Sequence, residues 1–264
     1  MAAASDRNGP GRVGGRDRQP LYSRPIDAIS LASLNLHCGT DMHGEPYDVT
    51  GVVERLDATI ICLQEDWVPD GASQLPALDG VGRAADTLGT AVHRAPLWRS
   101  VSRAALGTSR SGGRGDLCIS ILTALPVTGY QVVPLGRGPG DGVPRYAQVL
   151  RLRVTGGALR VVNTHLSCSV ASPLQLWRLW RQLRADPVPT VLAGDLNMPA
   201  LVARRYAGLT SLVRGTTFPA SKPVVQLDHV LVSRGIHAAG GSVLPPTASD
   251  HRPVWARFRL DSAS

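Results

Sequence analysis

The chain has 264 residues, of which 43% are hydrophobic, so it can form a sizeable core and is not disordered throughout. The formal net charge is +8, and Lys222 is the single lysine, so nearly all of the positive charge is arginine. Composition alone leaves two explanations for the excess of arginine over lysine. A GC-rich genome encodes arginine in place of lysine, and an anionic substrate favours arginine because the guanidinium group binds phosphate in a bidentate manner.

Residues 1–25 predict a disordered basic tail, because the first 24 residues contain five arginines, two aspartates and no apolar run. No segment is long enough to span a membrane. The four cysteines lack CxxC spacing, which argues against a zinc or redox motif and favours a reducing compartment. We therefore expect a cytoplasmic monomer with one folded domain over residues 26–261.

The first half of the chain predicts few elements. Strands are expected at Ile29–Leu36 and at Ala58–Leu63, and a short helix is expected after Asp48. The second of these strands is apolar throughout, which is typical of a strand buried on both faces. Beyond it the pattern is weak. It predicts one strand around Thr90–His93 and a mobile loop at Ser109–Gly115, where glycine, serine and arginine cluster.

The second half contains more strands. Arg145–Val154 and Ala158–His165 are β-rich runs separated by two glycines, which predicts a hairpin. Many strands with few helices indicate an α+β fold in which two sheets pack together with helices outside them. Further strands are predicted at Leu117–Leu122, Val127–Val133, Thr190–Ala193, Leu227–Val232, His237–Val243 and Pro253–Phe258.

One helix in the second half is clearly marked. Ser172 is a potential N-cap, with Pro173 at the first helical position, and Pro187 would end the helix. The apolar face is predicted to consist of Leu176, Trp177, Trp180 and Leu183.

Polar side chains recur directly before or after the apolar strands. If the strands lie side by side, these groups meet at one rim of the sandwich. A rim with several carboxylates is stabilised by a cation, and oxygen ligands favour Mg²⁺, Mn²⁺ or Ca²⁺ over zinc. The groups are Asn35, Glu65, His165, Asp195, Asn197, Asp228, Asp250 and His251.

These residues stand in the ordered motifs SLNLH, CLQED, NTHL, GDLN, QLDHVLV and SDHRP. The series resembles the endonuclease/exonuclease/phosphatase superfamily, which includes deoxyribonuclease I, apurinic endonucleases, sphingomyelinases and inositol-phosphate phosphatases. The resemblance runs from about residue 28 to 260. It implies a four-layer α/β/β/α sandwich of two packed mixed β-sheets and a Mg²⁺-dependent hydrolase of phosphoesters, with Mn²⁺ as a possible substitute.

The resemblance also implies a metal site. Glu65 would be the principal Mg²⁺ ligand, Asn35 would lie beside the metal and the phosphate, and Asp250 would support the metal. His37 stands where some relatives carry an acidic second ligand, which puts a tight second metal site in doubt. His37 would contact the substrate or cap the strand.

The catalytic roles follow from the same resemblance. Asp195 would orient or deprotonate the attacking water, and Asn197 would hold a phosphoryl oxygen or position Asp195. His251 would donate a hydrogen bond or proton to the phosphoryl group, with Asp228 fixing its tautomer. His165 would bind the phosphate.

The resemblance further implies that Arg145, at the start of the strand before the hairpin, faces the phosphate. The alternative for this residue is a solvated surface arginine.

A phosphodiesterase or nuclease is the favoured function, because the basic balance favours nucleic acid as partner. A phosphatase or a phospholipid or sphingomyelin phosphodiesterase of the same superfamily is the alternative, and a catalytically inactive nucleic-acid- or protein-binding relative is the alternative of a different class. The sequence shows neither an aromatic-interleaved basic stripe nor an apolar membrane-touching loop. Residues 66–116 and 134–144 are the predicted determinants of substrate specificity.

Overall fold

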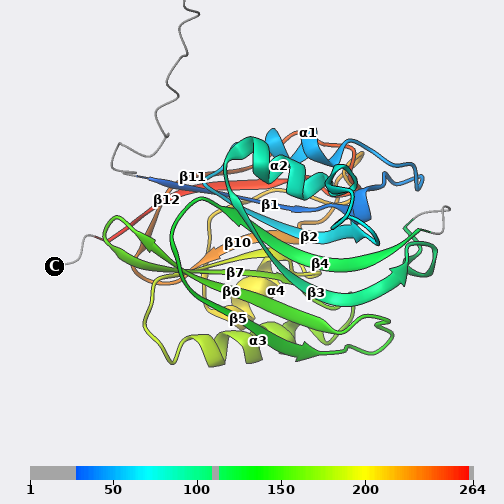
Figure 1. Cartoon of the computed structure of the whole chain (residues 1–264). Coiled ribbons are helices and arrows are strands. Elements are labelled where there is room, and N and C mark those ends of the chain that lie inside the picture. Colours follow the sequence, from blue (N-terminus) through cyan, green and yellow to red (C-terminus); the bar gives the residue numbers. More distant parts are fainter. Residues whose placement is uncertain (1–27, 109–112, 262–264) are drawn as a thin grey trace, which may run out of the picture.

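The computed structural model describes residues 28–108 and 113–261. Two six-stranded sheets pack face to face, with α1 and α2 on the outer side of one and α3 and α4 on the outer side of the other (Figure 1). The predicted α/β/β/α sandwich is confirmed. The predicted N-terminal tail and residues 109–112 of the predicted mobile loop lie outside the described residues.

The first sheet has the strand order β11-β12-β1-β2-β4-β3. β1 and β2 are parallel and the other pairs are antiparallel, so the sheet is mixed. Two short helices, α1 (Val49–Glu54) and α2 (Gly80–Leu88), cover it. The strands are β1 (Ile29–Asn35), β2 (Ile60–Pro69), β3 (Ala91–Ser102), β4 (Arg114–Thr123), β11 (Ile236–Val243) and β12 (Val254–Leu260).

The second sheet has the order β5-β6-β7-β8-β10-β9 and is also mixed, because β7 and β8 are parallel. The hairpin predicted at Gly156-Gly157 joins β6 to β7. Helices α3 (Ser172–Leu183) and α4 (Ala200–Ala207) pack on its outer face. The strands are β5 (Val127–Gly136), β6 (Arg145–Val154), β7 (Gly157–His165), β8 (Thr190–Asp195), β9 (Thr210–Ser211) and β10 (Asp228–Val232).

The largest core lies between the two sheets. Leu31 of β1, Ile60 of β2, Leu150 of β6 and Phe258 of β12 are fully buried there. The central strands are continuous apolar runs because one face meets the other sheet and the opposite face meets the helices. Within the described residues no helix has the length and apolar character needed to cross a membrane.

A polar bridge crosses this apolar interior. The Gln64 side-chain amide donates to Asn163 Oδ1 at 2.7 Å, and Asn163 Nδ2 donates to the carbonyls of Leu63 and Ser120, each at 2.9 Å. Gln64, Leu63 and Ser120 belong to the first sheet and Asn163 to the second, so the bridge fixes one sheet against the other. It lies one residue from both Glu65 and Thr164, just behind the rim.

The structure corrects the prediction for residues 66–115. β2 continues to Pro69, and the region contains α2 and the long hairpin-like pair β3 and β4. α2 has clear end signals, because the side chain of Asp79 accepts from Gly82 N–H and Gly89 ends the helix at a φ of 64°. The sequence of this region shows no clear strand pattern because β3 contains Pro96 and the register between β3 and β4 shifts twice.

The predicted start and apolar face of α3 were partly wrong. Ala171 occupies the N-cap position, and the Ser172 hydroxyl donates back to the Ser169 carbonyl. Leu176, Leu179 and Leu183 form the buried face, whereas Trp177 is 40% exposed. The three leucines repeat at helical spacing and occupy the face that packs on the sheet. Trp177 lies next to Leu176 in the chain and therefore projects from the flank of the helix, outside this buried face.

Candidate active site

The predicted polar side chains converge on one rim. Asn35, His165 and Asp195 end β1, β7 and β8, and Asp228 begins β10 beside them. Asp228 is the direct cross-strand partner of Asp195, and His165 pairs with Asp195 across the parallel ladder. The two sheets thus place their chemical groups at the same edge of the sandwich.

Glu65 reaches the rim through a β-bulge rather than at a strand end. Leu63 pairs with Ser120 and Asp66 pairs with Cys118, so the ladder is irregular at Gln64 and Glu65. Glu65 has a φ of 51°, which is an uncommon conformation for this residue type. The bulge turns the Glu65 carboxylate to the rim and sends the Asp66 carboxylate to Arg94 and Ser120 instead.

Asn35 lies between the two acids that matter most. Its Oδ1 accepts from the His37 backbone N–H at 2.9 Å, which directs its Nδ2 to Glu65 Oε1 at 3.3 Å and to Asp195 Oδ2 at 3.2 Å. Asn35 is almost fully buried. It therefore holds the two carboxylates at a set separation.

Asp195 is a buried carboxylate in an unfavourable field. Asn197 N–H donates to its Oδ1 at 3.0 Å, while Asn35 holds its Oδ2. Burial and then the negative charge of Asp228 raise the pKa of Asp195 to about 7, against the opposing effect of His251. A carboxylate with this pKa can accept a proton near neutral pH.

His251 and Asp228 form a hydrogen-bonded pair. His251 Nδ1 lies 2.8 Å from Asp228 Oδ2, and His251 Nε2 lies 3.7 Å from Asp195 Oδ2. Burial lowers the pKa of His251, but the carboxylates of Asp228 and Asp195 outweigh it and raise the pKa to about 10. The ring of Phe218 packs against it at 4.8 Å between centroids. The two carboxylates thus favour the protonated imidazole, and the bond to Asp228 fixes its orientation.

His165 has the opposite character. Its Nε2 lies 3.5 Å from Asp195 Oδ2 and its Nδ1 lies 3.8 Å from Glu65 Oε1 without a hydrogen-bond partner. Burial, then the positive charges of Arg145 and His251, hold the pKa of His165 well below its usual range. The structure thus places Arg145 near enough to act on this ring, and its Nη2 lies 3.5 Å from Asp141.

Asn197 and Asp250 have local partners. The Asn197 amide donates to the Leu166 carbonyl at 2.9 Å, and its φ of 50° lets its N–H turn back to Asp195. Asp250 Oδ2 lies 4.0 Å from His37 Nε2, and His37 Nδ1 lies 3.1 Å from the Thr40 carbonyl. Both predicted roles of Asn197, positioning Asp195 and binding a phosphoryl oxygen, stay predictions, as does metal support by Asp250.

Sequence reasoning missed three neighbours of the site. Cys38 Sγ lies 3.7 Å from Glu65 Oε2, the Ser249 hydroxyl donates to the Asn35 carbonyl at 2.6 Å, and Phe218 covers His251. Ser249 stands in the motif SDHRP, so the sequence places it near the site, but its hydrogen bond to the Asn35 carbonyl could not be predicted from the motif. Nothing in the local sequence marks Phe218.

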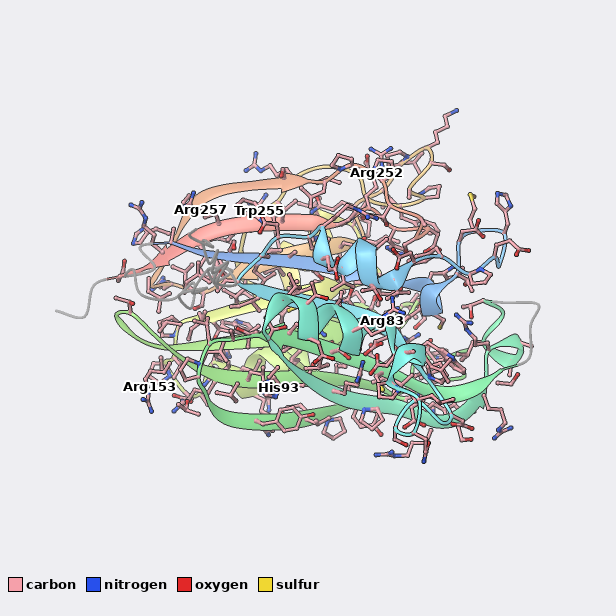
Figure 2. All side chains as sticks on the ribbon, turned by 45° about the horizontal axis from the view of Figure 1, so that its top comes forward. Arg83, His93, Arg153, Arg252, Trp255 and Arg257 are labelled. Atoms are coloured by element: carbon pink, nitrogen blue, oxygen red, sulfur yellow. The ribbon has the colours of Figure 1, made fainter. Side chains whose placement is uncertain are left out.

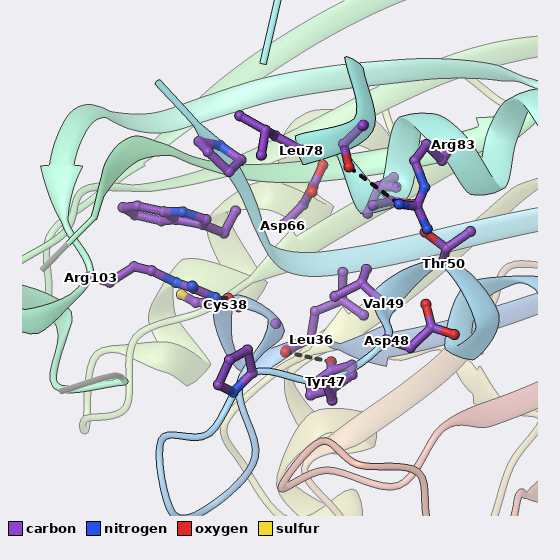
Figure 3. A pocket seen from close by; sticks show the side chains of 17 residues that line it. Leu36, Cys38, Tyr47, Asp48, Val49, Thr50, Asp66, Leu78, Arg83 and Arg103 are labelled. Carbon is purple, nitrogen blue, oxygen red and sulfur yellow. Dashed lines mark hydrogen bonds between the residues drawn. The ribbon is translucent and has the colours of Figure 1, made fainter. Parts of the chain in front are cut away.

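A pocket of about 280 Å³ adjoins the rim at Cys38 (Figure 3). Tyr47 closes one side and donates to the Leu36 carbonyl at 2.7 Å, while Arg103 donates to the Cys38 carbonyl and lies over the Trp67 ring. Cys38 lines this pocket, and its Sγ also lies 3.7 Å from Glu65 Oε2.

The donor chemistry of the rim fits a divalent cation. Four carboxylates gather here, and burial, followed by the charge of Asp228, raises the pKa of Asp195, so a nearby cation would favour its charged form. Ligand atoms of Asp195, Asp228 and His251 lie within 4.8 Å of one another. Asp228 and His251 are hydrogen-bonded to each other, however, so this trio is a poor set of metal ligands. Glu65 and Asp250 supply further carboxylate oxygens, whereas Asn35 turns its Nδ2 to Glu65 and Asp195 and its Oδ1 to the His37 N–H. Oxygen ligands suit Mg²⁺ or Mn²⁺.

Residues 32–251 match the family model described as the Endonuclease/Exonuclease/phosphatase family, and the chain belongs to this family. The resemblance inferred from the motifs is thereby confirmed. Members of the family hydrolyse phosphoesters. A search among curated proteins found no match.

Solved structures share the fold at low identity. An endonuclease/exonuclease/phosphatase from Beutenbergia cavernae is 19% identical, with a TM-score of 0.66 over 89% of this chain and 72% of that one. A mannosyl-6-phosphatase from Bacteroides thetaiotaomicron is 15% identical, with a TM-score of 0.63 over 88% and 100%. ANGEL2, a 2′,3′-cyclic phosphatase solved with adenosine-2′,3′-vanadate, is 16% identical, with a TM-score of 0.63 over 88% and 96%.

Proposed function

We propose that this protein is a divalent-metal-dependent phosphodiesterase that uses a water molecule as nucleophile. The observation that carries the proposal is the position of Asp195. Its carboxylate lies beside Asn35, His165 and His251, and its pKa is raised to about 7. One buried acid is thus surrounded by groups that can hold a phosphate and stabilise its charge.

The metal would be held by Glu65, with Asn35 and Asp250 in support. A bound divalent cation neutralises charge on the phosphoryl oxygens and polarises the phosphorus centre. Asn35 contributes by holding the Glu65 and Asp195 carboxylates together.

The remaining catalytic roles belong to side chains of the protein. Asp195 orients the attacking water and accepts its proton. Protonated His251 donates from Nε2 to a phosphoryl oxygen, while Asp228 keeps the proton on Nδ1. Neutral His165 donates a further hydrogen bond, and the nearby guanidinium group of Arg145 adds positive charge on the same side. These groups oppose the repulsion that makes phosphodiesters resistant to attack.

Nucleic acid is the substrate class that we place first. The net charge of +8 supports it, and the pocket of Figure 3 is lined by Cys38, whose Sγ lies 3.7 Å from Glu65 Oε2, so the pocket offers the substrate a binding surface close to the proposed metal ligand. Trp67 and Arg103 in its lining belong to the region 66–116 that the sequence predicts to set specificity. A phosphomonoesterase is the second candidate, because one relative of the same fold is a mannosyl-6-phosphatase.

The test is hydrolysis of bis(p-nitrophenyl) phosphate and p-nitrophenyl phosphate with Mg²⁺, with Mn²⁺ and in excess EDTA. The proposal predicts turnover of the diester that EDTA abolishes and Mg²⁺ or Mn²⁺ restores. Turnover of the monoester alone would favour the phosphatase. Full activity in EDTA, or none on any phosphoester offered, would contradict the proposal.

A further inference from the structure

The outer face formed by α3 and α4 is strongly basic. No aspartate or glutamate occurs in residues 142–185 or 196–227, the two stretches that contain these helices. The two helices pack against each other on the outer side of the second sheet (Figure 1). In and directly after them the chain carries five exposed arginines: Arg178, Arg181, Arg184, Arg204 and Arg205.

Aromatic side chains are interleaved with these arginines. Trp177 is 40% exposed and Tyr206 is 47% exposed, and the Arg181 guanidinium group lies 5.0 Å above the Trp177 ring. Between the C-terminal ends of the two helices is a pocket of about 460 Å³. Its polar and aromatic lining consists of Trp177, Trp180, Tyr206, Arg181, Arg184 and Arg205.

The charge of this face is not neutralised by internal ion pairs. The nearest acid in the sequence, Asp186, pairs with Arg151 and Arg160. Across the described parts of the chain, no carboxylate forms an ion pair with any arginine of α3 or α4. Five unpaired cations beside exposed aromatic rings repel one another, and a bound polyanion would relieve that repulsion.

The helices that carry the basic face follow active-site residues in the chain, and their arginines lie in and after their C-terminal halves. α3 starts in the segment that follows His165, and α4 starts shortly after Asn197. Both helices therefore have their N-terminal ends near the rim and extend from it to the pocket between Trp177 and Tyr206. A flexible strand of alternating phosphates and bases could follow this path in one direction.

We propose that the α3–α4 face binds a single-stranded segment of nucleic acid, with a base stacked in the pocket on Trp177 or Tyr206 and phosphates on Arg181, Arg184 and Arg205. Stacking on aromatic rings beside a basic groove is the usual way of binding single strands without reading their sequence. A base can enter a concave pocket with aromatic walls, whereas a flat anionic membrane cannot. This inference rests on the proposed function, because the strand bound on the α3–α4 face would be the substrate whose phosphodiester is cleaved at Asp195.

The experiment measures binding of fluorescein-labelled oligo-dT to the full chain with Asp195→Asn, so that the strand is not cleaved. Affinity is followed by anisotropy from about 50 to 200 mM salt. The test variant adds Arg181→Ala, Arg184→Ala and Arg205→Ala. The matched control adds Arg153→Ala, Arg257→Ala and Arg259→Ala, which remove the same charge from exposed positions on β6 and β12 (Figure 2).

We expect the log–log salt slope of the test variant to become shallower by about 0.7 for each phosphate that an arginine no longer neutralises, and the slope of the control to change little. Trp177→Ala or Tyr206→Ala should weaken binding about tenfold because the base no longer stacks on the ring. Equal slopes in the two triple variants would overturn the inference. So would binding confined to phosphatidylglycerol vesicles, which would make the face a membrane-binding surface. Hydrolysis of the small diester by the wild-type protein, measured separately, tests the proposed function independently.

Discussion

At the scale of single residues, two carboxylates that repel each other define the site. Asp195 and Asp228 are direct cross-strand partners on β8 and β10, and both are buried. Like charges opposite each other destabilise an antiparallel pair. His251 resolves this, because its Nδ1 bonds Asp228 at 2.8 Å and its Nε2 lies 3.7 Å from Asp195. In the proposed mechanism, the same positive charge on His251 would also face the phosphate of the substrate.

The first prediction concerns Asp228. Asp228→Asn removes the charge that keeps His251 protonated and oriented, so the turnover number should fall, with the ~10⁴-fold loss known for an orienting aspartate as an upper guide. The control is Asp66→Asn, an equally buried acid whose partners are Arg94 and Ser120 rather than a catalytic group. Asp66→Asn should lower stability and leave turnover by the folded protein nearly unchanged. Equal turnover losses in both variants would mean that Asp228 acts only through stability.

The second prediction concerns Glu65. Glu65→Gln keeps the size of the side chain but removes the ligand charge, so the Mg²⁺ concentration for half-maximal activity should rise by at least about tenfold, the lower bound for losing even an outer partner of a metal site. Glu45→Gln, at an exposed position, is the control. A Mg²⁺ titration of activity decides the matter. Coincident curves for the wild type and Glu65→Gln would remove Glu65 from the ligand set.

At the scale of secondary structure, the site depends on departures from regular strands. The bulge at Glu65 in β2 separates the Glu65 carboxylate from that of Asp66, and the φ of 50° at Asn197 bends the segment after β8 back onto Asp195. Directly behind the bulge, the bridge between Gln64 and Asn163 ties β2 to β7. The bridge holds β2 and β7 together beside the point where Glu65 Oε1 and His165 Nδ1 lie 3.8 Å apart across the two sheets.

The third prediction tests the bridge. Asn163→Leu retains the bulk of the side chain but leaves the carbonyls of Leu63 and Ser120 without this donor in the core. Because one unsatisfied buried polar group costs about 1–3 kcal/mol, the free energy of unfolding should fall by at least that amount. Thr128→Val removes one exposed hydrogen bond and should change it by less than about 0.5 kcal/mol. Urea unfolding of both variants is the measurement, and indistinguishable midpoints would show that the bridge does not hold the sheets.

Local pattern predicted some elements well and others poorly, for identifiable reasons. The buried strands at β2, β7 and β8 were visible because they are apolar on both faces. α4 was not predicted, because it is only eight residues long and Pro199 at its N-cap provides no side-chain capping signal. The bulge at Glu65 leaves no mark in the sequence, because it follows from the pairing of β2 with β4.

At the scale of the whole molecule, the sandwich brings the ends of distant strands to one rim. Asn35, His165 and His251 are far apart along the chain, yet they surround Asp195. The order of the motifs predicted this set because each motif stands at a strand end, whereas contacts between loops that are distant in the sequence, such as that of Phe218 with His251, could not be predicted. The basic aromatic face likewise combines two separate segments, α3 and α4, and was not predicted.

The central claim is that Asp195 activates water at this rim, and the most direct measurement is the turnover number of Asp195→Asn beside the wild type in saturating Mg²⁺. The substrate is whichever phosphoester the wild type hydrolyses fastest. Loss of a general base lowers a rate by about 10²- to 10⁴-fold, so we predict a fall within or beyond that range, with circular dichroism showing an intact fold. A folded Asp195→Asn variant that retained the wild-type turnover number would contradict the account.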